Sequence, residues 1–282
     1  MLGGALYWNG TGGNLIDSVF TDNNAAISGG GVAWYGANGI LTGSTFNGNN
    51  ATYGGGLYWR GANGSSFDST FTDNTASTGG ALYWWSSNGE FSGSNFTDNA
   101  ADGNGGAVTW WGDNGILTGS TFNGNNATYG GGLYWHGANG SLSDSSFTNN
   151  RARINGGGSG GAVYWWNSGG ILSDSIFAGN TAPIGGGAIS LNNVNSIINC
   201  SFINNKFVNN NSKSNGILTL FNLVIGGGSG IVDLVIGGDL SGTSIVVLNN
   251  ETYYYPPNAN INLIYLQNHE HETVKDNLQN NQ

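Results

Sequence analysis

Apolar residues recur along the chain at intervals of about 25 residues, and two motifs carry the pattern. The first is Phe-x-x-Asn, whose Phe positions follow one another at spacings of 26, 25, 25, 26, 25, 30 and 25 residues. The second is Gly-Gly-small-aliphatic, with a Trp two residues after the aliphatic position in seven of its copies. Self-similarity at a fixed period of this length indicates a solenoid or another repeat architecture.

The two motifs give four columns of equivalent residues, one member per copy. The Phe column contains Phe20, Phe46, Phe71, Phe96, Phe122, Phe147, Phe177 and Phe202. The Asn column contains Asn23, Asn49, Asn74, Asn99, Asn125, Asn150, Asn180 and Asn205. The aliphatic column contains Leu6, Val32, Leu57, Leu82, Val108, Leu133, Val163 and Ile189. The Trp column contains Trp8, Trp34, Trp59, Trp84, Trp110, Trp135 and Trp165.

Each copy divides into three short apolar stretches separated by turn residues. The stretches are of the types Gly-Gly-Ala-Leu-Tyr-Trp, Ile-Leu-Thr and Ser-Thr-Phe, and the last runs on to Asn and Ala. Three short strands within about 25 residues predict one coil of an all-β parallel β-helix. We expect about eight such coils over residues 1–209. A propeller blade is less suitable, because it needs four strands and about 40 residues.

Equivalent residues of successive coils lie about 4.8 Å apart in such a fold, so each column stacks on itself. We expect the Phe column to form an internal aromatic stack and the Asn column to form an amide ladder that satisfies turn backbone groups. The Asn-Gly pairs, such as 38–39 and 88–89, are expected at corners where positive φ is needed. Whether the Trp column lies inside or outside the solenoid is left open, because seven stacked indoles need a wide interior.

The last third of the chain departs from the repeat. Residues 210–250 contain aliphatic, Trp-free stretches and are predicted to form irregular final coils or a cap, which a solenoid needs at its open end. A separate small β-module is the alternative. Residues 251–282 are polar and acidic after Pro256-Pro257 and are predicted to be a linker or tail. Met1 falls inside a coil with no export signal before it, so we expect a piece of a longer protein.

The amino-acid composition excludes several classes of protein and of binding partner. Glycine contributes 52 of the 282 residues and proline only 3, which excludes collagen. Six Lys and Arg against 16 Asp and Glu give a net charge of −10, so we expect no nucleic-acid or anionic-membrane partner. No apolar run approaches the ~18 residues of a membrane span. The single Cys200 excludes an internal disulfide framework.

The combination of Gly-Gly-Ala-aliphatic and Phe-x-x-Asn resembles the repeat of the chlamydial polymorphic outer-membrane proteins, over about residues 3–210. Tyr-Trp after the aliphatic residue and the Asn-rich turns are similar to the adhesin-like surface proteins of methanogenic archaea. The resemblance implies a right-handed parallel β-helix that is exported to the cell surface and used for adhesion. It also implies host or neighbouring cells and their glycans as partners, and further modules in a longer polypeptide.

Aromatic side chains that should point outward are the candidate binding residues. A Tyr between the aliphatic and Trp positions lies on the opposite face of its strand, and the residue after the Trp should also lie outside. A row of exposed rings could stack on sugar rings. The competing interpretation is that the rings only stabilise the sheet through their neighbours. The candidates are Tyr58, Tyr83, Trp85, Trp111, Tyr134, Tyr164 and Trp166.

Charged residues offer weaker candidates. Asp144 and Asp174 share a column on adjacent coils, and oxygen pairs of this kind could hold Ca²⁺. Their column otherwise contains Gly or Asn, which indicates turn residues. Arg151 and Arg153 precede the one long coil, which is either a contact point or a tolerated surface insertion. No Ser/His/Asp set and no His-Glu-x-x-His motif occurs.

We therefore predict an extracellular, non-catalytic, adhesin-like or structural stalk without cofactor or metal, which makes weak multivalent contacts. The alternative in a different class is a β-helix polysaccharide lyase or glycoside hydrolase. Such an enzyme needs a groove in which Asp and Glu, or Arg and Lys, gather from several coils. A bare stalk without any ligand is the third interpretation.

Overall fold

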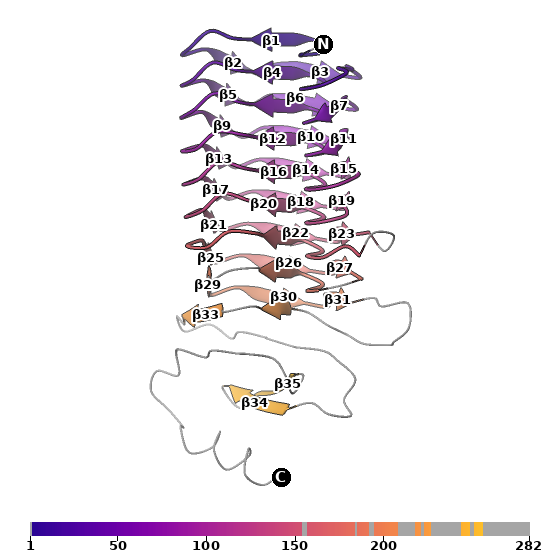
Figure 1. The fold of residues 1–282 in the computed structure, drawn as a ribbon, viewed down its shortest axis with the longest axis vertical. Coiled ribbons are helices and arrows are strands. Elements are labelled where there is room, and N and C mark those ends of the chain that lie inside the picture. Colours follow the sequence, from indigo (N-terminus) through magenta and orange to yellow (C-terminus); the bar gives the residue numbers. More distant parts are fainter. Residues whose placement is uncertain are drawn as a thin grey trace.

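The computed structural model describes residues 2–153, 157–183, 185–191 and 195–207, and the backbone of strands at 218–220, 223–226, 244–248 and 251–255. Every regular element within these residues is a β-strand. The strands stack coil upon coil into a parallel solenoid of about eight turns (Figure 1). The predicted all-β parallel β-helix is therefore confirmed, while its right-handedness stays a prediction.

Each full coil contributes one strand to each of four parallel sheets, which we name after the residues that they turn inward. The tryptophan sheet contains β1 (Leu6–Trp8), β4 (Val32–Trp34), β8 (Leu57–Trp59), β12 (Leu82–Trp84), β16 (Val108–Trp110), β20 (Leu133–Trp135), β24 (Val163–Trp165), β28 (Ile189–Leu191) and β32 (Leu218–Leu220). The leucine sheet contains β2 (Asn14–Ile16), β5 (Ile40–Thr42), β9 (Ser65–Phe67), β13 (Glu90–Ser92), β17 (Ile116–Thr118), β21 (Ser141–Ser143), β25 (Ile171–Ser173), β29 (Asn195–Ile198) and β33 (Leu223–Gly226).

The other two sheets complete the coil. The phenylalanine sheet contains β3 (Val19–Thr21), β6 (Thr45–Asn47), β10 (Thr70–Thr72), β14 (Asn95–Thr97), β18 (Thr121–Asn123), β22 (Ser146–Thr148), β26 (Ile176–Ala178) and β30 (Ser201–Ile203). The alanine sheet contains β7 (Asn50–Tyr53), β11 (Thr75–Thr78), β15 (Ala100–Ala101), β19 (Asn126–Ala127), β23 (Arg151–Ala152), β27 (Thr181–Ala182) and β31 (Lys206–Phe207).

The fourth strand of each coil differs from the three strands that the sequence pattern predicts. The stretch from Ser-Thr-Phe to Asn and Ala is interrupted by a residue in the left-handed region, such as Gly48 (φ 65°) or Asp73 (φ 52°). Only Gly, and to a lesser degree Asp and Asn, adopt this conformation at low cost. The chain therefore turns a corner after each Phe, and the Ala that follows begins the alanine sheet.

Each coil has four such corners, which divide it into four sides, one for each sheet. On three of these sides, the number of residues from one corner to the next is the same in every coil whose corners are described. The tryptophan side takes nine residues from one positive-φ corner to the next, and the leucine and phenylalanine sides take five each. The alanine side takes six or seven residues in six coils and eleven in the coil that contains Arg151. All variation in repeat length, including the long coil, therefore falls on the alanine side.

Stacked aromatic columns fill the interior, and the Trp column lies inside. Trp34, Trp59 and Trp84 are 0% exposed, and successive indoles of the column stack with centroids 4.6–5.1 Å apart and planes within 8–11° of parallel. The Phe rings stack at 4.4–5.1 Å with planes within 2–15°. Burial of each such side chain is worth about 1.5–3 kcal/mol by transfer.

The Asn-Gly pairs lie at the corner between the tryptophan and leucine sheets, and the two residues have different roles. The Asn takes the positive φ, as in Asn38 (φ 56°) and Asn88 (φ 56°). The Gly instead makes room for the indole, because a Cβ on Gly89 would overlap the ring of Trp84. The inward Trp and the corner Gly therefore depend on each other.

The Asn column forms a buried ladder along the corner between the phenylalanine and alanine sheets. In one rung, Oδ1 of Asn99 accepts hydrogen bonds from the backbone N–H and from Nδ2 of Asn74, both at 3.0 Å. Nδ2 of Asn99 donates to the Phe71 carbonyl at 2.9 Å and to Oδ1 of Asn125 at 3.0 Å. The same pattern joins the Asn residues from Asn49 to Asn205.

The described strands after residue 207 extend the solenoid and add a hairpin. β32 and β33 pair in parallel with β28 and β29. β34 (Ser244–Leu248) and β35 (Glu251–Tyr255) pair with each other in antiparallel fashion. This pairing crosses the boundary that the sequence pattern places at residue 250. The other parts of the predicted cap and tail lie outside the described residues.

Candidate functional site

Aromatic side chains also gather on the outer surface of the tryptophan sheet, in three adjacent columns that we call the aromatic face. The middle column lies at the centre of the strands and contains Tyr58, Tyr83, Tyr134 and Tyr164. The column after the strands contains Trp85, Trp111, His136 and Trp166. The column before the strands contains Tyr53 and Tyr129.

The column after the strands forms a stacked row along the solenoid axis. Ring centroids are 5.9 Å apart for Trp85 and Trp111, 4.0 Å for Trp111 and His136, and 6.4 Å for His136 and Trp166. Each inner ring is therefore partly covered by its neighbours. The indoles at the two ends stay accessible, with 48% of Trp85 and 43% of Trp166 exposed.

The expectation that the tyrosines form an exposed row is wrong for three of the four candidates. They do point away from the core, but the flanking columns lean over them. Tyr53 contacts the ring of Tyr83 edge-on at 5.5 Å, and the Trp85 ring lies 6.1 Å away on the other side. Strand alternation fixes the direction of a side chain, not what covers it. The buried three are Tyr83 (4% exposed), Tyr134 (7%) and Tyr164 (9%).

The protonation behaviour of the aromatic face follows from this burial. Removal from water raises the pKa of Tyr134 to about 12, and the neighbouring Tyr164 and Tyr129 add to the rise. Burial also raises the pKa of Tyr83 well above its ordinary value. Burial lowers the pKa of His136, with Asp113 acting in the opposite direction. The face is thus mostly apolar near neutral pH, with Arg60 as the charged neighbour of Tyr58. Tyr58 and Trp111 are half-buried, whereas Tyr53 and the two end indoles are exposed.

The paired carboxylates are corner residues. Asp144 (φ 50°) and Asp174 (φ 49°) hold the left-handed conformation between the leucine and phenylalanine sheets, and both are exposed. Asp73 and Asp98 do the same at the next corner. In the described part of the chain, no three Asp, Glu, His or Cys side chains come together as metal ligands would.

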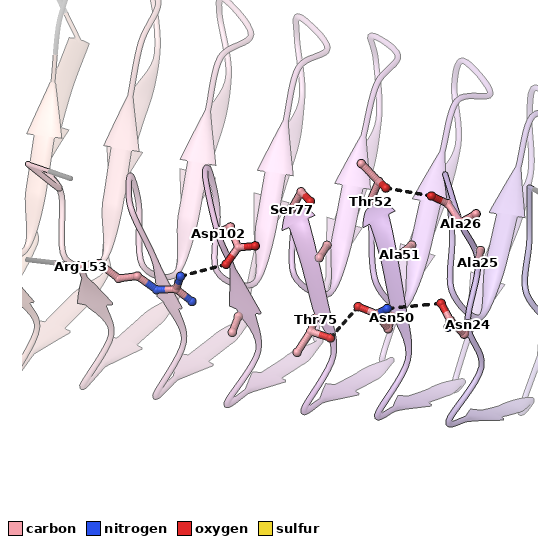
Figure 2. A pocket seen from close by; sticks show the side chains of 12 residues that line it. Asn24, Ala25, Ala26, Asn50, Ala51, Thr52, Thr75, Ser77, Asp102 and Arg153 are labelled. Carbon is pink, nitrogen blue, oxygen red and sulfur yellow. Dashed lines mark hydrogen bonds and ion pairs between the residues drawn. The ribbon is translucent and has the colours of Figure 1, made fainter. Parts of the chain in front are cut away.

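A second surface feature lies on the alanine sheet, where the outer face is hollowed into an open pocket of about 380 Å³ (Figure 2). We call it the alanine-sheet pocket. One wall carries Asn24, Asn50 and Thr75, and the other carries Thr52, Ser77 and Asp102, with alanines between them. From Asn24 to Asp102 it crosses four coils, roughly 15 Å at about 4.8 Å per coil.

Arg153 lies at one end of this pocket and is held from two sides. Its Nε donates to Oδ1 of Asn126 at 3.0 Å, and one Nη forms an ion pair with Oδ1 of Asp102 at 3.1 Å. The Arg153 side chain is 35% exposed and that of Asp102 is 82% exposed. The guanidinium therefore has a fixed orientation while part of it faces solvent.

Sequence reasoning missed this pocket, although it singled out Arg151 and Arg153 beside the long coil. The pocket is made of residues that look unremarkable one by one, namely Asn, Thr, Ser and Ala. The same residue types recur on the outer faces of the other sheets and at the turns, so the sequence carries no signal that sets this pocket apart.

Comparison with known proteins gives one family. Residues 68–83, 144–164 and 174–192 match the Chlamydia polymorphic membrane protein repeat. Each stretch begins at the corner before the phenylalanine sheet and runs through the alanine sheet into the tryptophan sheet. The match supports the resemblance to the chlamydial repeat. No curated protein and no solved structure matches the chain. No helix among the described residues could cross a membrane.

Proposed function

We propose that the chain is part of a non-catalytic, adhesin-like stalk at the cell surface, where the aromatic face makes weak multivalent contacts with cells or their glycans. Two findings support the proposal. The matched repeat is that of a membrane protein family, and the solenoid repeats equivalent surface positions at every coil. The kinship with adhesin-like proteins of methanogenic archaea, which the Tyr-Trp motif suggests, belongs to the same proposal.

The observation that carries the proposal is the pair of accessible indoles at the ends of one stacked row. Trp85 and Trp166 lie three coils apart, roughly 14 Å along the axis. Indoles offer a large apolar surface with little conformational freedom to lose on binding. Trp111 and Tyr58 contribute their half-buried rings, while Tyr83, Tyr134 and Tyr164 support the face from beneath. Each contact is weak alone, and the periodic stalk multiplies it.

The test is a double substitution, Trp85→Ala with Trp166→Ala, assayed for binding to whole cells and to a panel of glycans. We expect binding to fall at least tenfold, since burial of two large rings is worth several kcal/mol. The matched control is Ile116→Ala with Ile171→Ala, which removes two side chains of similar exposure (46% each) from the leucine sheet. Full binding by the Trp variant with an intact fold would overturn the role of the aromatic face. Oligosaccharide release from a polysaccharide would contradict a non-catalytic stalk.

A further inference from the structure

The Trp column is a continuous stack of indoles along the interior of the solenoid. Seven rings from Trp8 to Trp165 follow one another with centroids 4.6–5.1 Å apart and planes within 8–11° of parallel. The stack therefore extends over roughly 29 Å at about 4.8 Å per coil. Indole is one of the few side chains that give up one electron readily, and electrons pass between aromatic rings that are in contact. The column is thus a path for one-electron transfer along the axis.

The interior of the solenoid retains the proton of an oxidised indole. Loss of one electron makes the indole N–H acidic, and transfer of this proton to a base would fix the electron vacancy at one ring. Nε1 of Trp84, Trp110 and Trp135 is buried with no hydrogen-bond partner among the described residues. Nε1 of Trp59 donates to the Gly61 carbonyl at 3.0 Å, and a carbonyl is too weak a base to accept the proton. Every described Asp and Glu is exposed, so the vacancy stays mobile as a radical cation.

A positive charge within the column loses its contact with water, and burial of an uncompensated charge is costly. Two features offset this cost. Each inner indole lies between the π faces of two neighbours, both within the ~6 Å over which a ring face attracts a cation. The chain also has a net charge of −10, which favours positive charge inside it. Because the repeat gives successive indoles similar surroundings, transfer from one ring to the next is close to neutral in free energy.

The aromatic face connects this column to the surface, because in three coils an inner Trp is followed directly by an outer Trp. The outer row is interrupted by His136, whose imidazole is oxidised far less readily than an indole. The inner column continues past this point through Trp135, whose ring centroid lies 5.1 Å from that of Trp110 and 4.7 Å from that of Trp165. The adjacent pairs are Trp84 and Trp85, Trp110 and Trp111, and Trp165 and Trp166.

We propose that the Trp column transfers electrons along the solenoid axis between one-electron redox partners that contact the exposed indoles Trp85 and Trp166. An oxidant at one exposed indole takes one electron and is reduced. Each inner indole then supplies an electron to its oxidised neighbour, and a reductant at the other exposed indole supplies the last electron and is oxidised. No covalent bond forms or breaks, and no proton leaves the chain. This activity goes beyond the proposed surface contacts and needs neither a cell nor a glycan.

A photo-oxidant attached at the far end of the column tests the transfer in the whole chain. Cys200→Ser removes the single thiol and introduces the residue of the other coils, and Asn9→Cys beside Trp8 then carries a ruthenium polypyridyl complex. A cobalt(III) ammine takes the electron from the excited complex. We expect the spectrum of the protonated indole radical cation after the flash, and an oxidation product at Trp166 in peptide mass spectrometry.

Two results would overturn the transfer. One is a tyrosyl radical or a neutral indole radical as the only radical in the transient spectrum. The other is equal oxidation of Trp166 in an isotope-labelled chain that is mixed in without the complex, since the oxidant would then have reached that ring through solution.

Variants at the coil of His136 locate the path, because only the inner column is continuous there. Trp135→Phe should lower the yield of the Trp166 product at least tenfold. Phe147→Leu is the matched core control on the phenylalanine sheet of the same coil, and it should leave the yield unchanged. His136→Trp, added to Trp135→Phe, fills the gap in the outer row and should restore the yield. An unchanged yield in Trp135→Phe, an equal loss in Phe147→Leu, or a missing rescue would contradict the path.

Discussion

At the scale of the residue, the hydrogen bonds of the buried Asn ladder fix how successive coils align. Each amide uses its oxygen for two donors of the preceding coil and its NH₂ group for a carbonyl and the next amide. The members from Asn49 to Asn180 are 0% exposed, so no water can replace a missing partner. A network in which every group is satisfied fixes the coil register, whereas one gap leaves unpaired groups in the core.

Replacement of one rung should therefore be costly. In Asn99→Ala, the backbone N–H of Asn74 and the carbonyl of Phe71 both lose their partners, and we expect a loss of about 2–5 kcal/mol in the free energy of unfolding. Asn95→Ala, at an exposed position four residues earlier, should change it by less than about 0.5 kcal/mol. Urea unfolding of the two variants measures the difference. Equal stabilities would mean that the ladder adds nothing beyond shape.

At the scale of the element, the sequence predicted which residues form columns. It did not predict which residues lie around each column and bury it. Constancy of the Phe column indicated an inward stack, because an internal position cannot change without altering its neighbours. Constancy of the Trp column did not reveal its direction, which depends on the Gly that makes room for each indole. The tyrosines follow the predicted alternation, but their burial depends on rings from neighbouring columns. The fourth strand escaped because it has only two to four residues and shows no apolar pattern of its own, although the Asp, Gly or Asn at the corner before it is a turn residue.

The pairing of Trp with the corner Gly can be tested on two glycines. Gly89→Ala introduces a Cβ that overlaps Trp84, and we expect a loss of about 1–3 kcal/mol from overpacking. Gly119→Asn places a side chain where equivalent coils carry Asp or Asn at similar φ, and a Cβ there meets only the Gly93 nitrogen at 3.8 Å. That variant should be near neutral. Thermal unfolding gives both values, and a harmless Gly89→Ala would show that the indole can shift aside.

At the scale of the whole molecule, each coil contacts only the coils next to it, so stability varies along the axis. The interior of the first coil is less covered than that of the middle coils. Trp8 and Phe20 are half-buried, whereas their equivalents Trp84 and Phe96 are 0% exposed. A coil with one neighbour has about half of the stacking and strand pairing that a central coil has.

Native-state hydrogen exchange should therefore show a gradient. In the 282-residue chain, we expect the amides of β12 and β14 to exchange at least a hundredfold more slowly than those of β1 and β3, because opening of a central coil breaks pairing on two sides. Peptide-level mass spectrometry resolves these strands. Uniform protection from the first coil to the eighth would mean that the solenoid opens as a single cooperative unit.

The constant length of three sides has a consequence for the gene that encodes the chain. Residues 38–59 recur letter for letter at 114–135, three coils further on, so the two stretches are interchangeable in the fold. An exchange between such stretches adds or removes whole coils, and every corner, rung and indole meets an equivalent partner afterwards. The length of the solenoid can then change by whole coils without a new fold, because each coil contacts only its neighbours.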